Sequence, residues 1–172
     1  MIGEVTLSSG ARASYYVDAK RAILRPPAFR AVGALIAARA SELSASAVGG
    51  LTMGADPIAS AAIGDPRGAD LVAFFVRKEV KAHGLQRAIE GPLLAPGTRC
   101  LVVEDVTTSG ASTIRAIERI VEADLIVAGV VTVLDRASGA AAAIGAACGA
   151  PFSALTTIDE VYPDRPDRPP AD

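Results

Sequence analysis

Short, continuous runs of apolar residues recur through the middle of the chain. They read "SAVGGL" at 46–51, "LVAFFV" at 71–76, "CLVVED" at 100–105 and "IVAGVVTVLD" at 126–135. Apolar runs of this length are typical of strands that are buried on both faces, as in parallel sheets. We therefore predict a strand of a mostly parallel sheet at each of these positions.

Helical patterns separate most of these runs. The segment 26–43 begins with proline and places Phe29, Val32, Ile36 and Leu43 at steps of three, four and seven residues, as on one face of an amphipathic helix. Further helical patterns cover 55–64, 111–123 and 137–147. Strands that alternate with helices indicate an α/β domain with right-handed crossovers.

The two ends of the chain differ from this pattern. Residues 4–20 alternate loosely between apolar and polar, and "SYYVD" favours extended structure, so we predict strands or a hairpin there. From residue 163 onward the chain has four prolines in ten residues and no large apolar side chain, which indicates disorder. The 172 residues therefore predict one compact domain at 1–162 and a disordered proline-rich tail at 163–172.

Composition and the first residues of the chain bear on where the protein is located in the cell. Apolar residues make up 51% of the chain, but charge or glycine interrupts them well before the roughly 20 residues that a membrane span needs. The first residues show no secretory pattern, so we expect a cytoplasmic protein without a membrane segment. Cys100 and Cys148 lack zinc-site spacing, and we expect reduced thiols.

Charge argues for a small anionic ligand. The net charge of −2 speaks against a nucleic-acid partner. One segment is nevertheless basic, because 77–87 contains a single acidic residue among several cations. Its basic side chains, together with the only histidine of the chain, are Arg77, Lys78, Lys81, His83 and Arg87.

The stretch "LVVEDVTTSGAST" at 101–113 places a hydroxyl-rich turn between a strand and a helix. Ligands of open parallel sheets bind at the carboxyl ends of the strands. The free N–H groups of a helix N-terminus, with the hydroxyls of Thr107, Thr108, Ser109 and Ser112, can hold a phosphate. Gly110 lets the backbone approach that anion closely.

Two acids precede this turn and would repel a phosphate on its own. Glu104 and Asp105 fit a ligand that also offers hydroxyls or a divalent cation, as a sugar phosphate does. The alternative is an ordinary strand end followed by a capped helix, which accounts for one hydroxyl but not for the whole set. Neither a P-loop nor a G-x-G-x-x-G pattern is present in the sequence.

The motif at 101–112 resembles the signature of phosphoribosyltransferases, which bind 5-phosphoribosyl 1-diphosphate (PRPP). Three further stretches resemble the orotate phosphoribosyltransferase family. They are "VTLSSGARASYYVDAKR" near the start, the basic segment "VRKEVKAHGLQRAIEG" and "VLDRASGA" after the last apolar run. The resemblance runs from about residue 5 to residue 140 in the order of the family.

The resemblance implies a type I phosphoribosyltransferase fold: a central, mostly parallel sheet flanked by helices, a small N-terminal hood region and a mobile catalytic loop at 77–91. The implied reaction transfers the phosphoribosyl group of PRPP to orotate. It yields orotidine 5′-monophosphate and diphosphate, a step of de novo pyrimidine (UMP) biosynthesis.

The resemblance also implies roles for individual residues. Glu104 and Asp105 hold the ribose hydroxyls, and Thr108 and Arg136 contact orotate, with Arg136 on its carboxylate. Lys81, His83 and Asp105 are the implied catalytic residues. The diphosphate meets Arg77, Lys78, Lys81 and His83. The remaining PRPP-binding residues, of which those from Thr107 to Ser112 surround the 5-phosphate, are Val106, Thr107, Thr108, Ser109, Gly110, Ala111 and Ser112.

Mg²⁺ is the implied cofactor. It is carried by PRPP, so few direct protein ligands are expected. The implied assembly is a homodimer that shares the basic loop between subunits. Two alternatives stay open: a PRPP-sensing regulator of the same fold, and a phosphoribosyltransferase for a purine base. The basic loop and Arg136 favour the orotate enzyme, because a purine offers Arg136 no carboxylate.

The chain departs from the family pattern at two positions. Ser8 and Met53 stand where family members commonly have lysine. Both changes remove a positive charge near the expected PRPP site. Lys20 and Arg21 are the nearest candidates in the sequence to supply one.

Overall fold

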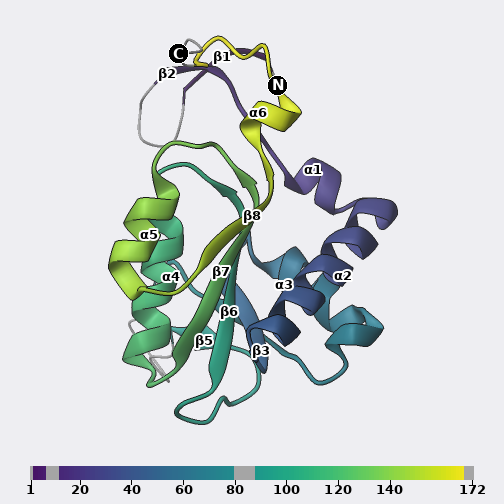
Figure 1. Ribbon diagram of the computed structural model, residues 1–172, viewed down its shortest axis with the longest axis vertical. Helices are drawn as coiled ribbons and strands as arrows, with labels where there is room; N and C mark the ends of the chain where they lie inside the picture. The colour runs from purple at the N-terminus through teal and green to yellow at the C-terminus, as the bar shows by residue number, and fades with distance from the viewer. Residues whose placement is uncertain (1, 7–11, 80–87, 169–172) are drawn as a thin grey trace.

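The computed structural model describes residues 2–6, 12–79 and 88–168. Within these residues, six strands form a central sheet in the order β5-β4-β3-β6-β7-β8 (Figure 1). Only β5 runs antiparallel to its neighbour, and the other pairs are parallel. The strands are β3 (Ala47–Leu51), β4 (Val72–Val76), β5 (Ile89–Glu90), β6 (Arg99–Thr107), β7 (Ile126–Asp135) and β8 (Phe152–Thr157).

The four predicted strands are confirmed as β3, β4, β6 and β7. Their continuous apolar runs are explained by burial on both faces, which is complete along β3. Two strands were not predicted: the short β5 and the edge strand β8, whose residues are all half-buried. The edge position of β8 explains why its sequence lacks a long apolar run.

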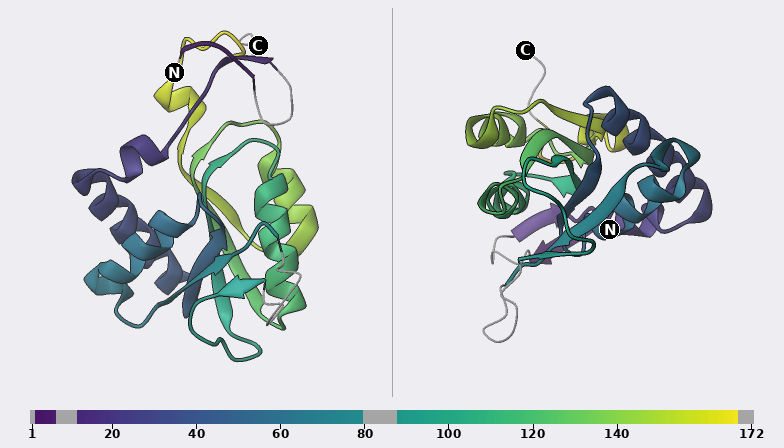
Figure 2. Two further views of the ribbon diagram at one scale, coloured as in Figure 1. Left: turned by 180° about the vertical axis from the view of Figure 1, so that it is seen from behind. Right: turned by 90° about the horizontal axis from the view of Figure 1, so that it is seen from below.

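Helices cover both faces of the sheet, as Figures 1 and 2 show. One hydrophobic core includes Ile36 and Ile58 of the helices on one face, and the other includes Ile120 and Ile144 on the opposite face. The first face carries α1 (Lys20–Ile23), α2 (Pro26–Glu42), α3 (Asp56–Gly64) and the 3-10 helix η1 (Pro66–Gly68), and the second carries α4 (Ala111–Glu122) and α5 (Ala140–Cys148). The predicted α/β fold class is confirmed.

A small two-stranded sheet lies beyond one end of the central sheet, close to the C-terminal segment (Figure 1). It pairs β1 (Ile2–Thr6) with β2 (Arg12–Tyr15) in antiparallel register, which confirms the predicted strands near the N-terminus. The neighbouring helix α6 (Ile158–Val161) begins with a capping box between Thr157 and Glu160. Strands β1 and β2 form the predicted N-terminal hood region, and α6 lies beside them (Figure 1).

The segment from residue 163 onward, for which the sequence predicts disorder, is described in part. Residues 163–168 are described, and Arg165 within them is only 7% exposed. Its guanidinium pairs with Asp159 and with Asp167. Ion pairs rather than apolar side chains hold this segment, so its proline-rich composition did not reveal them. Residues 169–172 lie outside the described part.

Two expectations from composition can be compared with the structure. Among the described helices, none has the length and apolar character to cross a membrane. Cys100 and Cys148 are free thiols, Cys100 being buried. Burial raises the pKa of the Cys100 thiol to about 12, so it stays protonated at neutral pH.

Candidate active site

The two acids of the sequence motif lie at the end of β6, in the middle of the sheet. Glu104 and Asp105 are 4% and 8% exposed. The Glu104 carboxylate accepts hydrogen bonds from Ser112 Oγ at 2.7 Å and Thr113 Oγ1 at 3.4 Å. The hydroxyls that open α4 therefore hold Glu104 in place.

Glu104 has an unusual protonation equilibrium. Burial raises its pKa to about 7, and the negative charge of the adjacent Asp105 acts in the same direction. The hydrogen bond from Ser112 opposes this rise because it stabilises the carboxylate. Both the protonated and the charged form of Glu104 are therefore accessible near neutral pH. A bound cation, or a ligand hydroxyl that donates to the carboxylate, would favour the charged form.

Lys20 provides a positive charge beside the acids. Its Nζ lies 2.8 Å from Asp105 Oδ2 and 3.2 Å from Asp18 Oδ1. Burial alone would lower the pKa of Lys20, but the hydrogen bonds and charges of the two carboxylates raise it above the ordinary value. Of the two basic residues that the sequence offers as a nearby positive charge, Lys20 is the one that pairs with Asp105. The two residues are 85 positions apart in the chain.

A cleft of about 250 Å³ opens above the acids, and we call it the acid-pair cleft. Gly54 forms part of its wall: a Cβ there would lie 2.5 Å from Asp105 Oδ1 and 2.6 Å from Glu104 Oε1. Only glycine lets this turn after β3 approach the acids so closely. The other lining residues are Lys20, Leu51, Thr52, Met53, Lys78, Val106 and Ser112.

Sequence reasoning did not assign Gly54 to the site. The glycine-rich turn "GLTMGAD" was visible in the sequence, but only the fold reveals that it meets the acids. Met53, where the resemblance leads us to expect a lysine, lines the same cleft and is 71% exposed.

The hydroxyl side chains of the turn fall into two groups, those bonded within the protein and those exposed to solvent. Thr107 is 1% exposed and donates to Asp135 Oδ1 at 3.2 Å, and Ser112 is engaged with Glu104. Thr108 and Ser109 are exposed. The first group stabilises the turn, so the second group and the N–H groups of α4 are those available to an anion.

Gly110 makes the turn into α4 possible. It has a positive φ of 79° and is the N-cap residue of the helix. A residue with a Cβ is strained in this conformation. The chain can therefore present the first N–H groups of α4 toward the end of β6, as the sequence predicts.

Arg136 lies one residue beyond β7, the strand next to β6. Its backbone N–H donates to the Thr107 carbonyl at 2.9 Å, which ties it to the hydroxyl-rich turn. Its side chain is 13% exposed, and its Cζ lies 4.6 Å from the centre of the Tyr15 ring. Its NH2 donates to Asp167 Oδ2 at 3.2 Å. The predicted orotate-binding arginine is thus held between two residues that are distant in sequence.

The basic segment is described only at its two ends. Lys78 lines the acid-pair cleft. Arg77 instead donates through Nε to Glu90 Oε1 at 2.5 Å, across the base of the segment. The predicted residues Lys81 and His83 lie outside the described residues.

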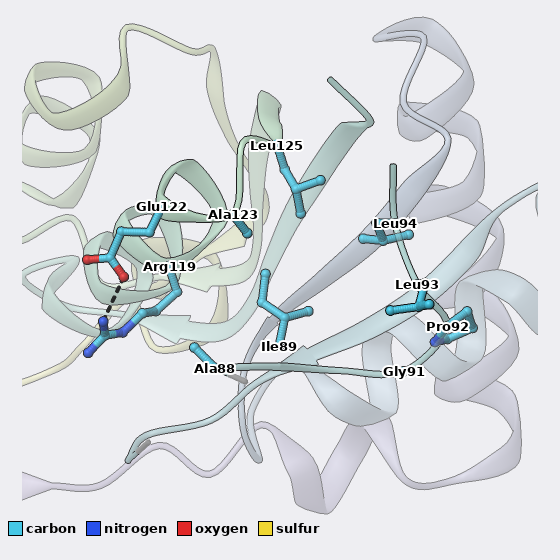
Figure 3. A pocket seen from close by; sticks show the side chains of 10 residues that line it. All are labelled: Ala88, Ile89, Gly91, Pro92, Leu93, Leu94, Arg119, Glu122, Ala123 and Leu125. Atoms are coloured by element: carbon cyan, nitrogen blue, oxygen red, sulfur yellow. Dashed lines mark hydrogen bonds and ion pairs between the residues drawn. The ribbon is translucent and has the colours of Figure 1, made fainter. Parts of the chain in front are cut away.

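A larger cavity of about 320 Å³ lies elsewhere, between residues 88–94 and the C-terminal end of α4 (Figure 3). Its walls are mostly apolar, with Leu93 79% exposed. The charged residues that line it, Arg119 and Glu122, pair with each other at 2.7 Å. Because this cavity is at the opposite end of α4 from Ser112, it is separate from the acid-pair cleft.

The acid-pair cleft offers few ligands for a metal ion. No group of three or more His, Cys, Asp or Glu side chains suited to a metal occurs in the described part of the chain. Glu104 and Asp105 supply carboxylate oxygens, the donors that Mg²⁺ prefers. Two carboxylates suit an Mg²⁺ ion that takes most of its ligands from a substrate and water.

A doubly wound sheet with paired acids at the end of a central strand, followed by a hydroxyl-rich helix N-terminus, defines the class of type I phosphoribosyltransferases. Comparisons with known proteins refine this assignment. Orotate phosphoribosyltransferase of Corynebacterium glutamicum (strain R) is 50% identical over 159 residues, covering 92% of this chain and 85% of that protein. No protein-family model matches the chain.

Solved structures agree in fold and sequence. Orotate phosphoribosyltransferase of Mycobacterium tuberculosis H37Rv in complex with Fe(III) dicitrate superposes with a TM-score of 0.79 at 44% identity, covering 94% of this chain and 90% of that one. The same enzyme in complex with PRPP gives a TM-score of 0.72 at 38% identity over 85% and 82% of the two chains. The chain belongs to the orotate phosphoribosyltransferase family.

Proposed function

We propose that the acid-pair cleft is where this chain transfers the 5-phosphoribosyl group from PRPP to orotate, giving orotidine 5′-monophosphate and diphosphate in de novo pyrimidine (UMP) biosynthesis. The observation that carries this proposal is the position of Arg136. It lies one residue beyond β7, hydrogen-bonded to the turn that follows the acids on β6. In this proposal the sugar phosphate and the carboxylate of the second substrate bind at neighbouring strand ends.

In this proposal PRPP binds along the end of β6. Glu104 and Asp105 accept hydrogen bonds from the ribose hydroxyls. At Asp105 these hydroxyls bind in place of Lys20 or beside it. The 5-phosphate lies on the first N–H groups of α4, with Thr108 and Ser109 around it. The complex of the M. tuberculosis relative with PRPP supports this choice of ligand.

Orotate binds beside it at the end of β7. The planar guanidinium of Arg136 can donate two parallel hydrogen bonds to the substrate carboxylate, and this pairing is stronger and more specific than one to a point charge. Thr108 is exposed on the neighbouring turn and can contact the base. A purine would leave the guanidinium without a carboxylate partner, so this site favours orotate.

The residues of the chain act on the charge that develops during transfer. Positive charge grows on the ribose as diphosphate departs, and the carboxylates of Glu104 and Asp105 stabilise it. Lys78, with Lys81 and His83 of the basic loop, stabilises the negative charge of the leaving diphosphate. A loop that closes over the cleft would also keep water from the activated sugar.

Mg²⁺ is the cofactor in this proposal. Glu104 and Asp105 are the residues that would hold it together with PRPP oxygens, and when bound it supplies neutralisation of the diphosphate charge. We also propose a cytoplasmic homodimer in which Lys81 and His83 reach the cleft of the other subunit.

The reaction can be tested directly. Purified protein is mixed with Mg²⁺, PRPP and orotate, and the loss of orotate absorbance is followed against a sample without PRPP. The proposal predicts that orotate is consumed. Consumption of adenine or hypoxanthine with orotate left intact would show that the base is a purine. PRPP binding without consumption of any base would favour a PRPP-sensing regulator.

The shared loop has a separate test. If the proposal holds, Lys81→Ala and Asp105→Asn each leave only a small residual activity, because every site of either variant dimer lacks one of the two groups. Mixing and exchanging the two variants should restore activity, because one site of each mixed dimer then has both an intact loop and intact acids. A mixture that stays inactive, although sedimentation shows mixed dimers, would contradict loop sharing.

A further inference from the structure

Arg136 already has a carboxylate partner in the chain itself. Asp167 Oδ2 accepts from Arg136 NH2 at 3.2 Å, and both Asp167 oxygens lie 3.1 Å from the Tyr15 hydroxyl. Tyr15 also places its ring against the Arg136 guanidinium, with 4.6 Å between Cζ and the ring centre. The three side chains form one cluster at the end of β7.

The segment that carries Asp167 is anchored from one side. The Arg165 side chain is 5% exposed, and its Nε lies 3.1 Å from Asp167 Oδ1. Its backbone N–H donates to the Tyr162 carbonyl at 3.3 Å, and the Tyr162 ring meets Tyr15 edge-on at 5.4 Å. Residues 163–168 are therefore held over the hood region, close to Arg136.

The pairing of Asp167 with Arg136 does not use the full capacity of the guanidinium. Arg136 donates only its NH2 to Asp167, and its Nε is buried without a hydrogen-bond partner among the described residues. A carboxylate that binds an arginine fork through two parallel bonds forms a stronger pair than one held by a single bond. The Asp167 side chain is also 49% exposed, so water can solvate it when it leaves.

We propose that Asp167 takes the position of the substrate carboxylate on Arg136 and that orotate displaces it. Residues 163–168 then determine the apparent affinity for orotate. This inference rests on the proposed role of Arg136 in binding the orotate carboxylate. A base without a carboxylate cannot replace Asp167, so the pair also disfavours uncharged bases.

The kinetic test is the Asp167→Asn variant. Removing the competing charge should lower the KM for orotate by roughly two- to fivefold, the range expected from a half-exposed ion pair, and leave the KM for PRPP unchanged. Asp164→Asn is the matched control, because Asp164 is an exposed carboxylate of the same segment. It should leave both KM values unchanged. A higher or unchanged KM for orotate in Asp167→Asn would overturn the proposal.

Hydrogen exchange tests displacement without relying on turnover. In the wild-type protein, saturating orotate should accelerate amide exchange in the peptide that contains residues 163–168, whereas uracil should not. Slower or unaltered exchange with orotate would overturn the proposal.

Failure of this inference and failure of the proposed function can be distinguished. If Arg136→Gln raises the KM for orotate while Asp167→Asn has no effect, Arg136 binds orotate but Asp167 does not compete. If Arg136→Gln itself leaves the KM for orotate unchanged, the proposed role of Arg136 fails first.

Discussion

The neighbouring strands β6 and β7 end side by side, but their ends are built in different ways. At the end of β6, Glu104 is held by Ser112, eight residues later. At the end of β7, Arg136 is held by Asp167, 31 residues later, and by the ring of Tyr15 near the N-terminus. The acids and hydroxyls at the β6 end come from one continuous stretch of sequence, although Lys20 and Gly54 join them from other parts of the chain. The cluster at the β7 end is drawn entirely from three separate regions.

The two strand ends also differ in how deeply their carboxylates are buried. Glu104 and Asp105 are almost inaccessible, and hydrogen bonds from α4 orient Glu104. Asp167, the partner of Arg136, is half-exposed. A ligand at β6 therefore meets buried acids, one of them paired with Lys20, whereas a ligand at β7 meets a guanidinium whose carboxylate partner is half-exposed. If PRPP binds at the β6 end and orotate at the β7 end, as we propose, only orotate has to displace a carboxylate of the chain.

The largest expected effect comes from the β6 end. Asp105→Asn should lower kcat/KM for PRPP roughly 100-fold, because it removes a charged hydrogen-bond acceptor and leaves the half-buried Lys20 with one charged partner fewer. Steady-state kinetics with PRPP varied at saturating orotate measures this. Glu118→Gln on the exposed face of α4 is the control and should behave as wild type.

At the β7 end the expected effect is on the other substrate. Arg136→Gln should raise the KM for orotate by a factor of roughly 10 to 100, the value of one or two charge-assisted hydrogen bonds. The KM for PRPP should change far less. The exposed Arg30 of α2 provides a control, since Arg30→Gln also removes one positive charge. If Arg136→Gln raised the KM for PRPP as much as the KM for orotate, the two strand ends would not serve different substrates.

Protonation of Glu104 gives the β6 end its own pH dependence. Its pKa is about 7 in the folded chain against an ordinary value of 4.5, so the folded state binds more protons between these values. The contribution of Glu104 to stability is complete below about pH 4.5 and is lost as the pH rises through about 7. Urea unfolding from pH 5 to 8 should show a decline on the order of 1–3 kcal/mol.

The variant Glu104→Gln checks the origin of this decline. Because glutamine does not titrate, the free energy of unfolding should depend less on pH in this variant than in the wild type. An equally steep decline in Glu104→Gln would assign the pH dependence to other groups.

The smallest expected effects come from the glycines that open the helices behind the two strands. Gly110 and Gly139 both have positive φ, but a Cβ on Gly110 would lie 3.1 Å from Ile144 Cγ1, whereas a Cβ on Gly139 meets nothing within 4 Å. Gly139→Ala should cost about 1 kcal/mol of stability from backbone strain, and Gly110→Ala about 2 kcal/mol. Urea unfolding compares the two variants.

Only Gly110→Ala should also raise the KM for PRPP, since it alters the helix N-terminus that follows β6. A rise of similar size in Gly139→Ala would indicate that the β7 turn contributes to PRPP binding.

Local patterns explain how much could be predicted from the sequence. The strand, the two acids and the helix start of the β6 site are contiguous, so one stretch of sequence contains both the groups and their spacing. The four core strands were predictable for the same reason, because burial on both faces produces continuous apolar runs. Short or half-buried elements such as β5 and β8 carry no such pattern.

Contacts between distant residues were not predictable in this way. The bond of Lys20 to Asp105 and the close approach of Gly54 to the acids depend on how β3 and α1 are placed beside β6. The pairing of Asp167 with Arg136 was hidden in a segment whose prolines predicted disorder. Resemblance to a family predicts a substrate-binding role for Arg136, but it does not predict the side chain of Asp167 that pairs with it.

Calorimetric titration of PRPP with Mg²⁺ into Asp105→Asn and Arg136→Gln tests the division between the two strand ends most directly. Arg136→Gln should bind PRPP as tightly as the wild type, and Asp105→Asn should bind it much more weakly. Loss of PRPP binding in Arg136→Gln, or undiminished binding in Asp105→Asn, would contradict this division.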